Sequence, residues 1–244
     1  MAYKIFIDGK EGTTGLKIFE RFANRNDIEI MQIDESKRKD VDVRKKFINE
    51  SDFTFLCLPD DAARESVSLC TNPNTRIIDA STAHRTNPDW NYGFPELSGD
   101  FRKGIENSKR VAVPGCYASG FVALGYPLVA SGIMPKDYPV VIHAVSGYSG
   151  AGKKAIAQYE DAGRNVELDS PRLYALTQQH KHLPEMSKIT GLENAPVFCP
   201  IVADFYSGME VTVPLFKSQL NYGGLEEIKQ IYKELYNTEI ISYK

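Results

Sequence analysis

Short apolar runs alternate with helical stretches along the first half of the chain. The apolar runs are YKIFID, IEIMQI, DFTFLCLP, RIIDAS and RVAVPG, and the helical stretches between them include LKIFERFAN and DAARESVSLC. This alternation is typical of a parallel sheet whose strands are joined by crossover helices. Because the runs are continuously apolar, we expect strands covered on both faces, as in a doubly wound, Rossmann-type α/β sheet.

The pattern changes after Cys116. Here the runs YPVVIHAVSG, PVFCPIVADF and MEVTVPLF surround a polar segment, residues 150–185. MEVTVPLF alternates with period two, which predicts a strand with one covered face. The apolar residues of GLEEIKQIYKELY fall on one helical stripe, which we interpret as core packing. The sequence therefore predicts two domains: a doubly wound domain over residues 1–115, and a mixed α/β domain that carries the chemistry over residues 116–244.

Composition and charge exclude several classes of function. The 244 residues are 25% charged and 42% hydrophobic, with a net charge of −3. Such a chain has no global basic field for nucleic acid, and no apolar run approaches the roughly 20 residues of a membrane span. MAYKIFIDGK lacks the apolar core of a signal peptide, so we expect a cytoplasmic protein. The four cysteines show neither paired spacing nor a metal-ligand pattern, so we expect reduced thiols and no metal.

A glycine-rich turn stands at the first strand–helix junction, in DGKEGTTGLKIFERF. Gly9, Gly12 and Gly15 are spaced so that the backbone turns tightly and a pyrophosphate can approach a helix N-terminus. The spacing is GxxGxxG rather than GxGxxG, so the preceding strand and the following helix carry the prediction of a dinucleotide site. A later strand ends in DASTAHR, and we expect the hydroxyls of Ser81 and Thr82 to face the same crevice.

The end of the second strand, IDESKRKD, bears on the choice of dinucleotide. It lies about 20 residues beyond the glycines, where a ribose-reading side chain falls. Asp34 favours NAD through the 2′-hydroxyl, whereas Ser36, Lys37 and Arg38 suit the 2′-phosphate of NADP. We expect NADP.

VAVPGCYASG places a lone cysteine where a strand turns into a helix. The first turn of a helix has unpaired N–H groups and a positive dipole end, which stabilise a thiolate. The alternative is that Cys116 is a small buried packing residue. The turn also lies at the carboxyl edge of the sheet, where the reactive ring of a dinucleotide is expected, so a catalytic thiol and a packing residue both stay open at this point.

Two further clusters carry candidate chemistry. SGYSGAGKKA combines a glycine-rich turn with two lysines, which suits an anionic group of a substrate but is not a Walker motif. Its candidate substrate-binding residues are Ser146, Gly147, Ser149, Lys153 and Lys154. QHKHLPEM brings together His180, His182 and Glu185, a candidate acid/base group. A metal site would need more ligands than this cluster offers.

PGCY, SGYSGAGKK and HKHLPEM, in that order after a glycine-rich start, resemble the motifs of N-acetyl-gamma-glutamyl-phosphate reductases, particularly the shorter type. The resemblance covers most of the chain, including DASTAHR and YGFPEL. It implies a homo-oligomeric enzyme of arginine biosynthesis that uses NADPH to convert the acyl phosphate N-acetyl-glutamyl 5-phosphate to the semialdehyde. It also implies that Cys116 forms a thioester and that a histidine of HKHLPEM manages the proton; His180 and His182 both stay open.

The chain departs from this family at its end. It stops at EIISYK, whereas the family continues into a DNLGKGA-like segment that returns to the cofactor domain, so the resemblance predicts a weakly active or inactive chain. The alternatives are an enzyme like aspartate-semialdehyde dehydrogenase, which also forms a cysteine thioester, a cysteine hydrolase, and a non-catalytic cofactor-binding protein. NADPH binding discriminates against the hydrolase, which needs no dinucleotide crevice.

Overall fold

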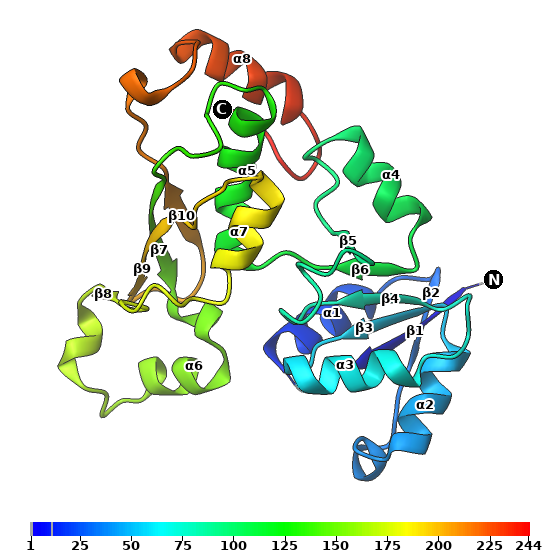
Figure 1. The fold of residues 1–244 in the computed structure, drawn as a ribbon. Coiled ribbons are helices and arrows are strands. Elements are labelled where there is room, and N and C mark those ends of the chain that lie inside the picture. Colours follow the sequence, from blue (N-terminus) through cyan, green and yellow to red (C-terminus); the bar gives the residue numbers. More distant parts are fainter. Residues whose placement is uncertain (1, 11) are drawn as a thin grey trace. The chain divides into compact units, whose positions relative to one another are not determined.

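The structure of the protein is a computed structural model that describes residues 2–10 and 12–244 (Figure 1). The chain divides into two units. The first comprises residues 1–95 and 100–114, and the second comprises residues 96–99 and 115–244. Among the residues described, no helix combines the length and the hydrophobicity that crossing a membrane requires.

The first unit is built on a six-stranded, all-parallel sheet with the strand order β2-β1-β3-β4-β6-β5. Its strands are β1 (Tyr3–Asp8), β2 (Ile28–Met31), β3 (Phe53–Leu56), β4 (Arg76–Asp79), β5 (Asn91–Tyr92) and β6 (Arg110–Ala112). The helices are α1 (Thr13–Phe22), the 3₁₀ turn η1 (Glu35–Lys37), α2 (Val41–Glu50), α3 (Asp60–Leu69) and α4 (Gly99–Asn107). Successive residues from Ile5 to Asp8 are buried, because helices cover both faces of this sheet (Figure 1). The predicted doubly wound sheet is confirmed.

Helix α2 lies between the runs IEIMQI and DFTFLCLP, where the sequence pattern predicted no helix. Asp40 caps it by accepting the N–H groups of Asp42 and Val43, as a good N-cap residue does. Only Arg44 and Ile48 of its ten residues are buried. So narrow a buried stripe leaves little periodic signal in the sequence, which is why the helix was missed.

The second unit contains a four-stranded mixed sheet with the order β10-β7-β9-β8. Its strands are β7 (Val141–Gly147), β8 (Arg172–Leu173), β9 (Val197–Ala203) and β10 (Met209–Thr212). The helices are α5 (Cys116–Ala130), α6 (Lys153–Glu160), α7 (Leu183–Thr190) and α8 (Leu225–Leu235), with 3₁₀ turns η2 (Tyr148–Ala151), η3 (Val166–Asp169) and η4 (Lys217–Gln219). β7 and β9 are parallel, and the two outer strands run antiparallel to their neighbours. The expected mixed α/β architecture is confirmed.

Helices α5 and α7 pack together, and one face of this sheet is covered (Figure 1). On the covered face, Ile142, Ala144 and Phe198 are buried. α5 approaches β10 so closely that a Cβ at Gly120 would lie 2.6 Å from Val211 Cγ2. On the opposite face, Val141 and His143 of β7 and Val197 of β9 are exposed.

Helix α8 packs against α5 less deeply than its sequence indicates. Leu225, at the start of the expected stripe, is 66% exposed, and none of the eleven residues of α8 is fully buried. Two tyrosine hydroxyls make the connection: Tyr232 donates to the carbonyl of Leu124, and Tyr236 donates to the carbonyl of Ala123, each at 2.6 Å.

Candidate active site

The turn between β1 and α1 requires glycine at two of its three positions. Gly9 has φ of +88°, and a Cβ there would lie 2.4 Å from the carbonyl oxygen of Cys57. A Cβ at Gly15 would lie 2.5 Å from the carbonyl oxygen of Gly9. At Gly12, the N-cap of α1, the same oxygen would be 3.4 Å away, which is an ordinary contact. Two glycines therefore shape the turn, and the third keeps the helix N-terminus open to a ligand.

A pocket of about 520 Å³ lies at the carboxyl ends of β1, β2 and β3. Its lining residues are Phe6, Ile7, Asp8, Gly9, Lys10, Gly12, Ile30, Met31, Gln32, Ile33, Glu35, Arg38, Lys39, Cys57, Leu58 and Pro59. Of the residues expected to bind a cofactor, Gly9, Gly12 and Arg38 line this pocket, whereas Gly15, Ser36, Lys37, Ser81 and Thr82 are not part of its lining. Its position is the one at which open α/β sheets bind dinucleotides.

The cations that line the pocket are not the full set expected from the sequence. Arg38 and Lys39 line it, and Arg38 Nη1 lies 3.9 Å from Glu35 Oε1. Ser36 instead donates its hydroxyl and its N–H to Asp34, and these bonds hold the pKa of that exposed carboxyl below its usual value. Lys39 was missed, although it belongs to the same run of cations, because the 3₁₀ turn decides which side chains of the run face inward.

Buried carboxylates support the pocket. Asp8 at the end of β1 accepts Nε and Nη2 of Arg44, each at 3.2 Å, and the Ser66 hydroxyl at 2.8 Å. The ion pair compensates a charge that would otherwise be costly to bury and would repel a pyrophosphate. Ser81 and Thr82 donate their hydroxyls to Asp79 and Asp60, respectively, so each offers a ligand only an acceptor oxygen.

In the second unit, Cys116 is the first residue of α5 and is exposed. The exposed thiol rules out the reading of Cys116 as a buried packing residue. Gly115, the N-cap, has its carbonyl bonded to the Ser119 N–H at 2.7 Å and its N–H bonded to Glu185 Oε1 at 2.8 Å. The position thus combines access for a substrate with the stabilising field of a helix N-terminus.

Helix α7 and the segment before it supply the histidines. The rings of His180 and His182 are 4.7 Å apart and nearly perpendicular. His182 is 4% exposed, whereas His180 is half-buried. Burial and, to a lesser extent, the charge of Lys181 lower the pKa of His180 below its usual value. His180 Nδ1 accepts the N–H of His182 at 3.2 Å, so the neutral ring carries its proton on Nε2.

Tyr117, which the sequence analysis missed, lies next to both histidines and is hydrogen-bonded to Ser146 and Tyr174. Its buried ring lies 6.0 Å from His180 and 6.2 Å from His182 between ring centroids. Its hydroxyl donates to Ser146 Oγ at 2.8 Å and accepts the hydroxyl of Tyr174 at 3.0 Å. Burial raises the pKa of Tyr174. The hydrogen bond to Tyr117 and the electrostatic effect of Cys116 raise this pKa further. The only sequence signal was its place directly after the cysteine.

The glycine-rich turn after β7 is more tightly bonded than expected. The N–H groups of Gly147 and Ser149 donate to the carbonyls of Gly208 and Tyr206, each at 3.0 Å. A Cβ at Gly147 would lie 2.6 Å from the carbonyl oxygen of Phe205, so this glycine serves a close backbone approach. Lys153 and Lys154 are exposed in the first turn of α6. Because these N–H groups are already bonded, the N-terminus of α6 is the part of the motif that remains available to bind an anion.

No three His, Cys, Asp or Glu side chains converge as metal ligands in residues 2–10 and 12–244.

Family models match both units. Residues 4–105 match the NAD binding domain of semialdehyde dehydrogenase, and residues 116–242 match the dimerisation domain of semialdehyde dehydrogenase. Together with a pocket at the carboxyl edge of the first unit's sheet and an exposed cysteine in the second unit, these matches define a protein of the semialdehyde dehydrogenase class.

The relatives narrow this class. The chain is 48% identical over 241 residues to N-acetyl-gamma-glutamyl-phosphate reductase 2 of Nostoc sp., covering 97% of this chain and 75% of that protein. It is 50% identical over 222 residues to the N-acetyl-gamma-glutamyl-phosphate reductase of Brucella ovis, covering 90% and 72%. Within the semialdehyde dehydrogenase class, the chain belongs to the N-acetyl-gamma-glutamyl-phosphate reductase family, which confirms the resemblance of its motifs.

Solved structures share the fold. A probable aspartate-semialdehyde dehydrogenase from Pseudomonas aeruginosa superposes with a TM-score of 0.71 at 13% identity, covering 98% of this chain and 80% of that one. Aspartate semialdehyde dehydrogenase with NADP from Candida albicans gives a TM-score of 0.62 at 14% identity, covering 97% and 77%. At such identities the likeness establishes the common fold.

Proposed function

We propose that the protein reduces N-acetyl-glutamyl 5-phosphate to N-acetyl-glutamate 5-semialdehyde and phosphate, using NADPH and Cys116 as the nucleophile. The observation that carries this proposal is the exposed Cys116 at the start of α5 in a chain 48% identical to a named N-acetyl-gamma-glutamyl-phosphate reductase. In this proposal residues 1–115 bind the dinucleotide, and residues 116–244 carry the substrate chemistry.

The residues of the first unit fit the phosphates of a dinucleotide. The N-cap of α1 at Gly12 presents a helix N-terminus to the pocket, and Arg38 and Lys39 supply positive charge at its far end. Two cations beside one carboxylate, Glu35, favour the 2′-phosphate of NADP over a bare hydroxyl. When bound, NADPH supplies a hydride to the thioester carbonyl carbon.

The thiol chemistry follows from the position of Cys116. The thiolate attacks the carbonyl carbon of the acyl phosphate, the bond from that carbon to the phosphate oxygen breaks, and a thioester forms. After reduction, the hemithioacetal on Cys116 collapses to the aldehyde, with the electron pair of the C–S bond returning to sulfur. Splitting the reduction in this way replaces one difficult step by two easier ones.

His180 is our choice for the proton-transfer group. In its protonated form the ring can donate a proton to the oxygen that becomes negative during reduction, and the neutral ring that remains accepts the proton back during collapse. His180 is half-buried, whereas His182 is 4% exposed, so His180 is the more accessible of the two. Such a role is typically worth about 10²–10⁴-fold in rate.

The substrate's own charges suit the start of α6. Lys153 and Lys154 at that helix N-terminus would attract a carboxylate or phosphate, while Ser146 and Ser149 offer hydroxyls. We also propose a homo-oligomer, formed through the exposed face of the β7–β9 sheet in the unit that matches a dimerisation domain. We further propose a cytoplasmic location, because the relatives are named as reductases of a small acyl phosphate.

Replacing Cys116 with Ser tests the proposed function. An alcohol is a much poorer nucleophile than a thiolate, so turnover should fall by at least about 10³-fold while NADP binding is retained. The assay is the NADP- and phosphate-dependent oxidation of N-acetylglutamate semialdehyde, followed by cofactor absorbance. Cys70→Ser, at a half-buried cysteine of the other unit, is the matched control.

Activity with aspartate semialdehyde instead of the N-acetylated compound would assign the alternative substrate. Near-wild-type turnover of Cys116→Ser would exclude the thioester mechanism.

A further inference from the structure

Glu185 has an unusual place for a carboxylate. Its side chain is 1% exposed, and Oε1 accepts the N–H of Gly115, a residue 70 positions earlier in the chain, at 2.8 Å. Burying a carboxylate is costly unless hydrogen bonds and favourable charges compensate. The groups that offset the cost of burying Glu185 therefore indicate the role of its side chain.

Two helix N-termini meet at this carboxylate. Glu185 is the third residue of α7, whose N-cap is His182, so it lies in the first turn of its own helix. Its partner Gly115 is the N-cap of α5. Positive dipole ends of helices favour a negative charge, and the α5–α7 packing brings the N-cap of α5 to a carboxylate that belongs to the first turn of α7. The carboxylate therefore bridges the starts of the two helices.

This bridge acts on the peptide that immediately precedes the nucleophile. The Gly115 carbonyl accepts both the N–H and the hydroxyl of Ser119, at 2.7 and 2.9 Å. With its N–H bonded to Glu185, Gly115 is held on both sides, and the Cα of Cys116 follows directly. A displacement of about 1 Å at a reacting group can cost 10²-fold in rate, so this restraint matters for the thiol.

We propose that Glu185 is a positioning residue: it holds Gly115 so that Cys116 projects from the first turn of α5, and it does not transfer protons. This differs from the acid/base role that the motif HKHLPEM led us to expect for it. A side chain 1% exposed with Oε1 already engaged is poorly placed to exchange protons with a substrate, whereas the half-buried His180 can do so. This inference rests on the proposed function only for the reaction that the kcat measurements follow.

Two substitutions separate positioning from proton transfer. Glu185→Gln keeps an acceptor oxygen at the same reach but cannot act as an acid or base. Glu185→Asp keeps a carboxylate but is one methylene shorter, so it falls short of Gly115. Positioning predicts that the Gln variant keeps kcat within about tenfold of wild type and that the Asp variant loses about 10²-fold in kcat with little change in KM. Proton transfer predicts the opposite order.

A second readout needs neither substrate nor cofactor. The Gly115 amide should be protected from hydrogen exchange in the wild type and in Glu185→Gln, and should exchange faster in Glu185→Asp and Glu185→Ala. Alkylation of Cys116 by iodoacetamide, followed on its peptide by mass spectrometry, should be several-fold slower in Glu185→Ala than in Glu185→Gln. Both of these variants lack the charge, so the difference between them reports the hydrogen bond. Glu193→Ala, at an exposed glutamate, is the matched control.

The outcomes distinguish the two proposals. If the Gln variant is as inactive as the Ala variant while exchange and alkylation are unchanged in both, Glu185 transfers protons and the positioning role is wrong. If Glu185→Ala leaves exchange, alkylation and kcat unchanged, the bond has no role. If the exchange and alkylation differences appear in a protein without reductase activity, positioning stands and the proposed function fails.

Discussion

At the scale of single residues, hydrogen bonds to the neighbouring residues restrain the backbone around Cys116, although its side chain is not buried. Cys116 is exposed, yet the residue before it is held through both of its backbone polar groups. Tyr117, the residue after it, is buried and bonded to Ser146 and Tyr174. An accessible thiol on a restrained backbone is what a nucleophile requires.

His180 links this site to pH. Its folded-state pKa lies below the unfolded value of 6.5, mainly because burial disfavours the charged ring. The unfolded chain therefore binds more protons than the folded one as the pH falls through 6.5, and the protein loses stability in that range. In denaturant titrations between pH 7.5 and 5.5, wild type should lose more stability than His180→Gln. Equal losses in the two proteins would contradict a depressed pKa.

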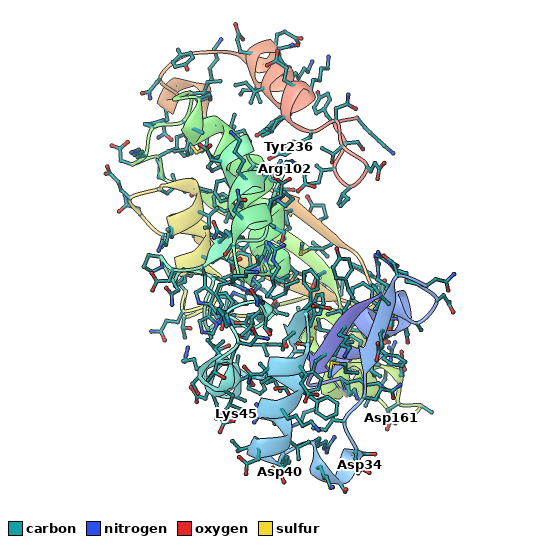
Figure 2. The ribbon with its side chains drawn as sticks, turned by 90° about the vertical axis from the view of Figure 1, so that its right-hand side faces the viewer. Asp34, Asp40, Lys45, Arg102, Asp161 and Tyr236 are labelled. Carbon is teal, nitrogen blue, oxygen red and sulfur yellow. The ribbon has the colours of Figure 1, made fainter. Side chains whose placement is uncertain are left out.

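Arg38 belongs to the cofactor side. Replacing it with Ala removes a charge-assisted contact to the 2′-phosphate, so NADP binding should weaken by about 1.5–3 kcal/mol, which is about 10- to 150-fold. NAD binding, which lacks that contact, should change little. Lys45, labelled on α2 in Figure 2, does not line the pocket, so Lys45→Ala is the matched control. A titration in which Arg38→Ala weakens both cofactors equally would refute the 2′-phosphate contact.

At the scale of elements, α5 contains a proline at position 127. Proline has no N–H, so the carbonyl of Ala123, four residues earlier, loses its helical partner. Tyr236 donates its hydroxyl to this same carbonyl, and Tyr232 donates to the next one, Leu124. Burial raises the pKa of both phenols, which keeps them protonated as donors. The region of α8 thus satisfies the backbone that Pro127 leaves open.

Tyr236→Phe should therefore destabilise the protein. The substitution keeps the ring and leaves the Ala123 carbonyl without its donor, at a cost of about 1–3 kcal/mol. Differential scanning calorimetry would show a lower Tm. Tyr206→Phe, which removes a hydroxyl from a side chain 48% exposed, serves as the control and should change Tm little. An unchanged Tm in Tyr236→Phe would mean that water replaces the hydroxyl at no cost.

At the scale of the whole molecule, the second unit exposes apolar side chains on one face of its sheet. In the second unit, Val141 and Val197 are cross-strand neighbours on the open face of the sheet, 39% and 51% exposed. Exposed apolar neighbours on a sheet are typical of an interface. Together with the match to a dimerisation domain, they favour contact with a second copy of the chain.

Placing charges on this face tests the assembly. The double variant Val141→Asp with Val197→Asp should shift the protein to monomers in sedimentation velocity, because two buried carboxylates per subunit would be costly in an interface. Val166→Asp changes a valine that is 74% exposed and lies outside the sheet, so it should leave the assembly intact. An unchanged oligomer in the double variant would place the interface elsewhere.

The sequence by itself determined the features that depend on neighbours along the chain. Continuous apolar runs predicted the parallel strands, because burial on both faces acts on each run separately. The glycines at 9 and 15 marked a turn that a Cβ would block, and the strand–turn–helix pattern predicted Cys116 at a helix start. Motif order was enough to indicate the family.

Only the tertiary structure decided which distant side chains meet. The Glu185–Gly115 bond joins residues 70 apart, Tyr117 connects with Tyr174 57 residues later, and Arg44 pairs with Asp8 across 36 residues. None of these contacts leaves a periodic trace, because each depends on how two elements pack and not on the local pattern of either. Hydrogen bonds between elements are specified by the packed fold as a whole, and the roles of the buried polar residues follow from it.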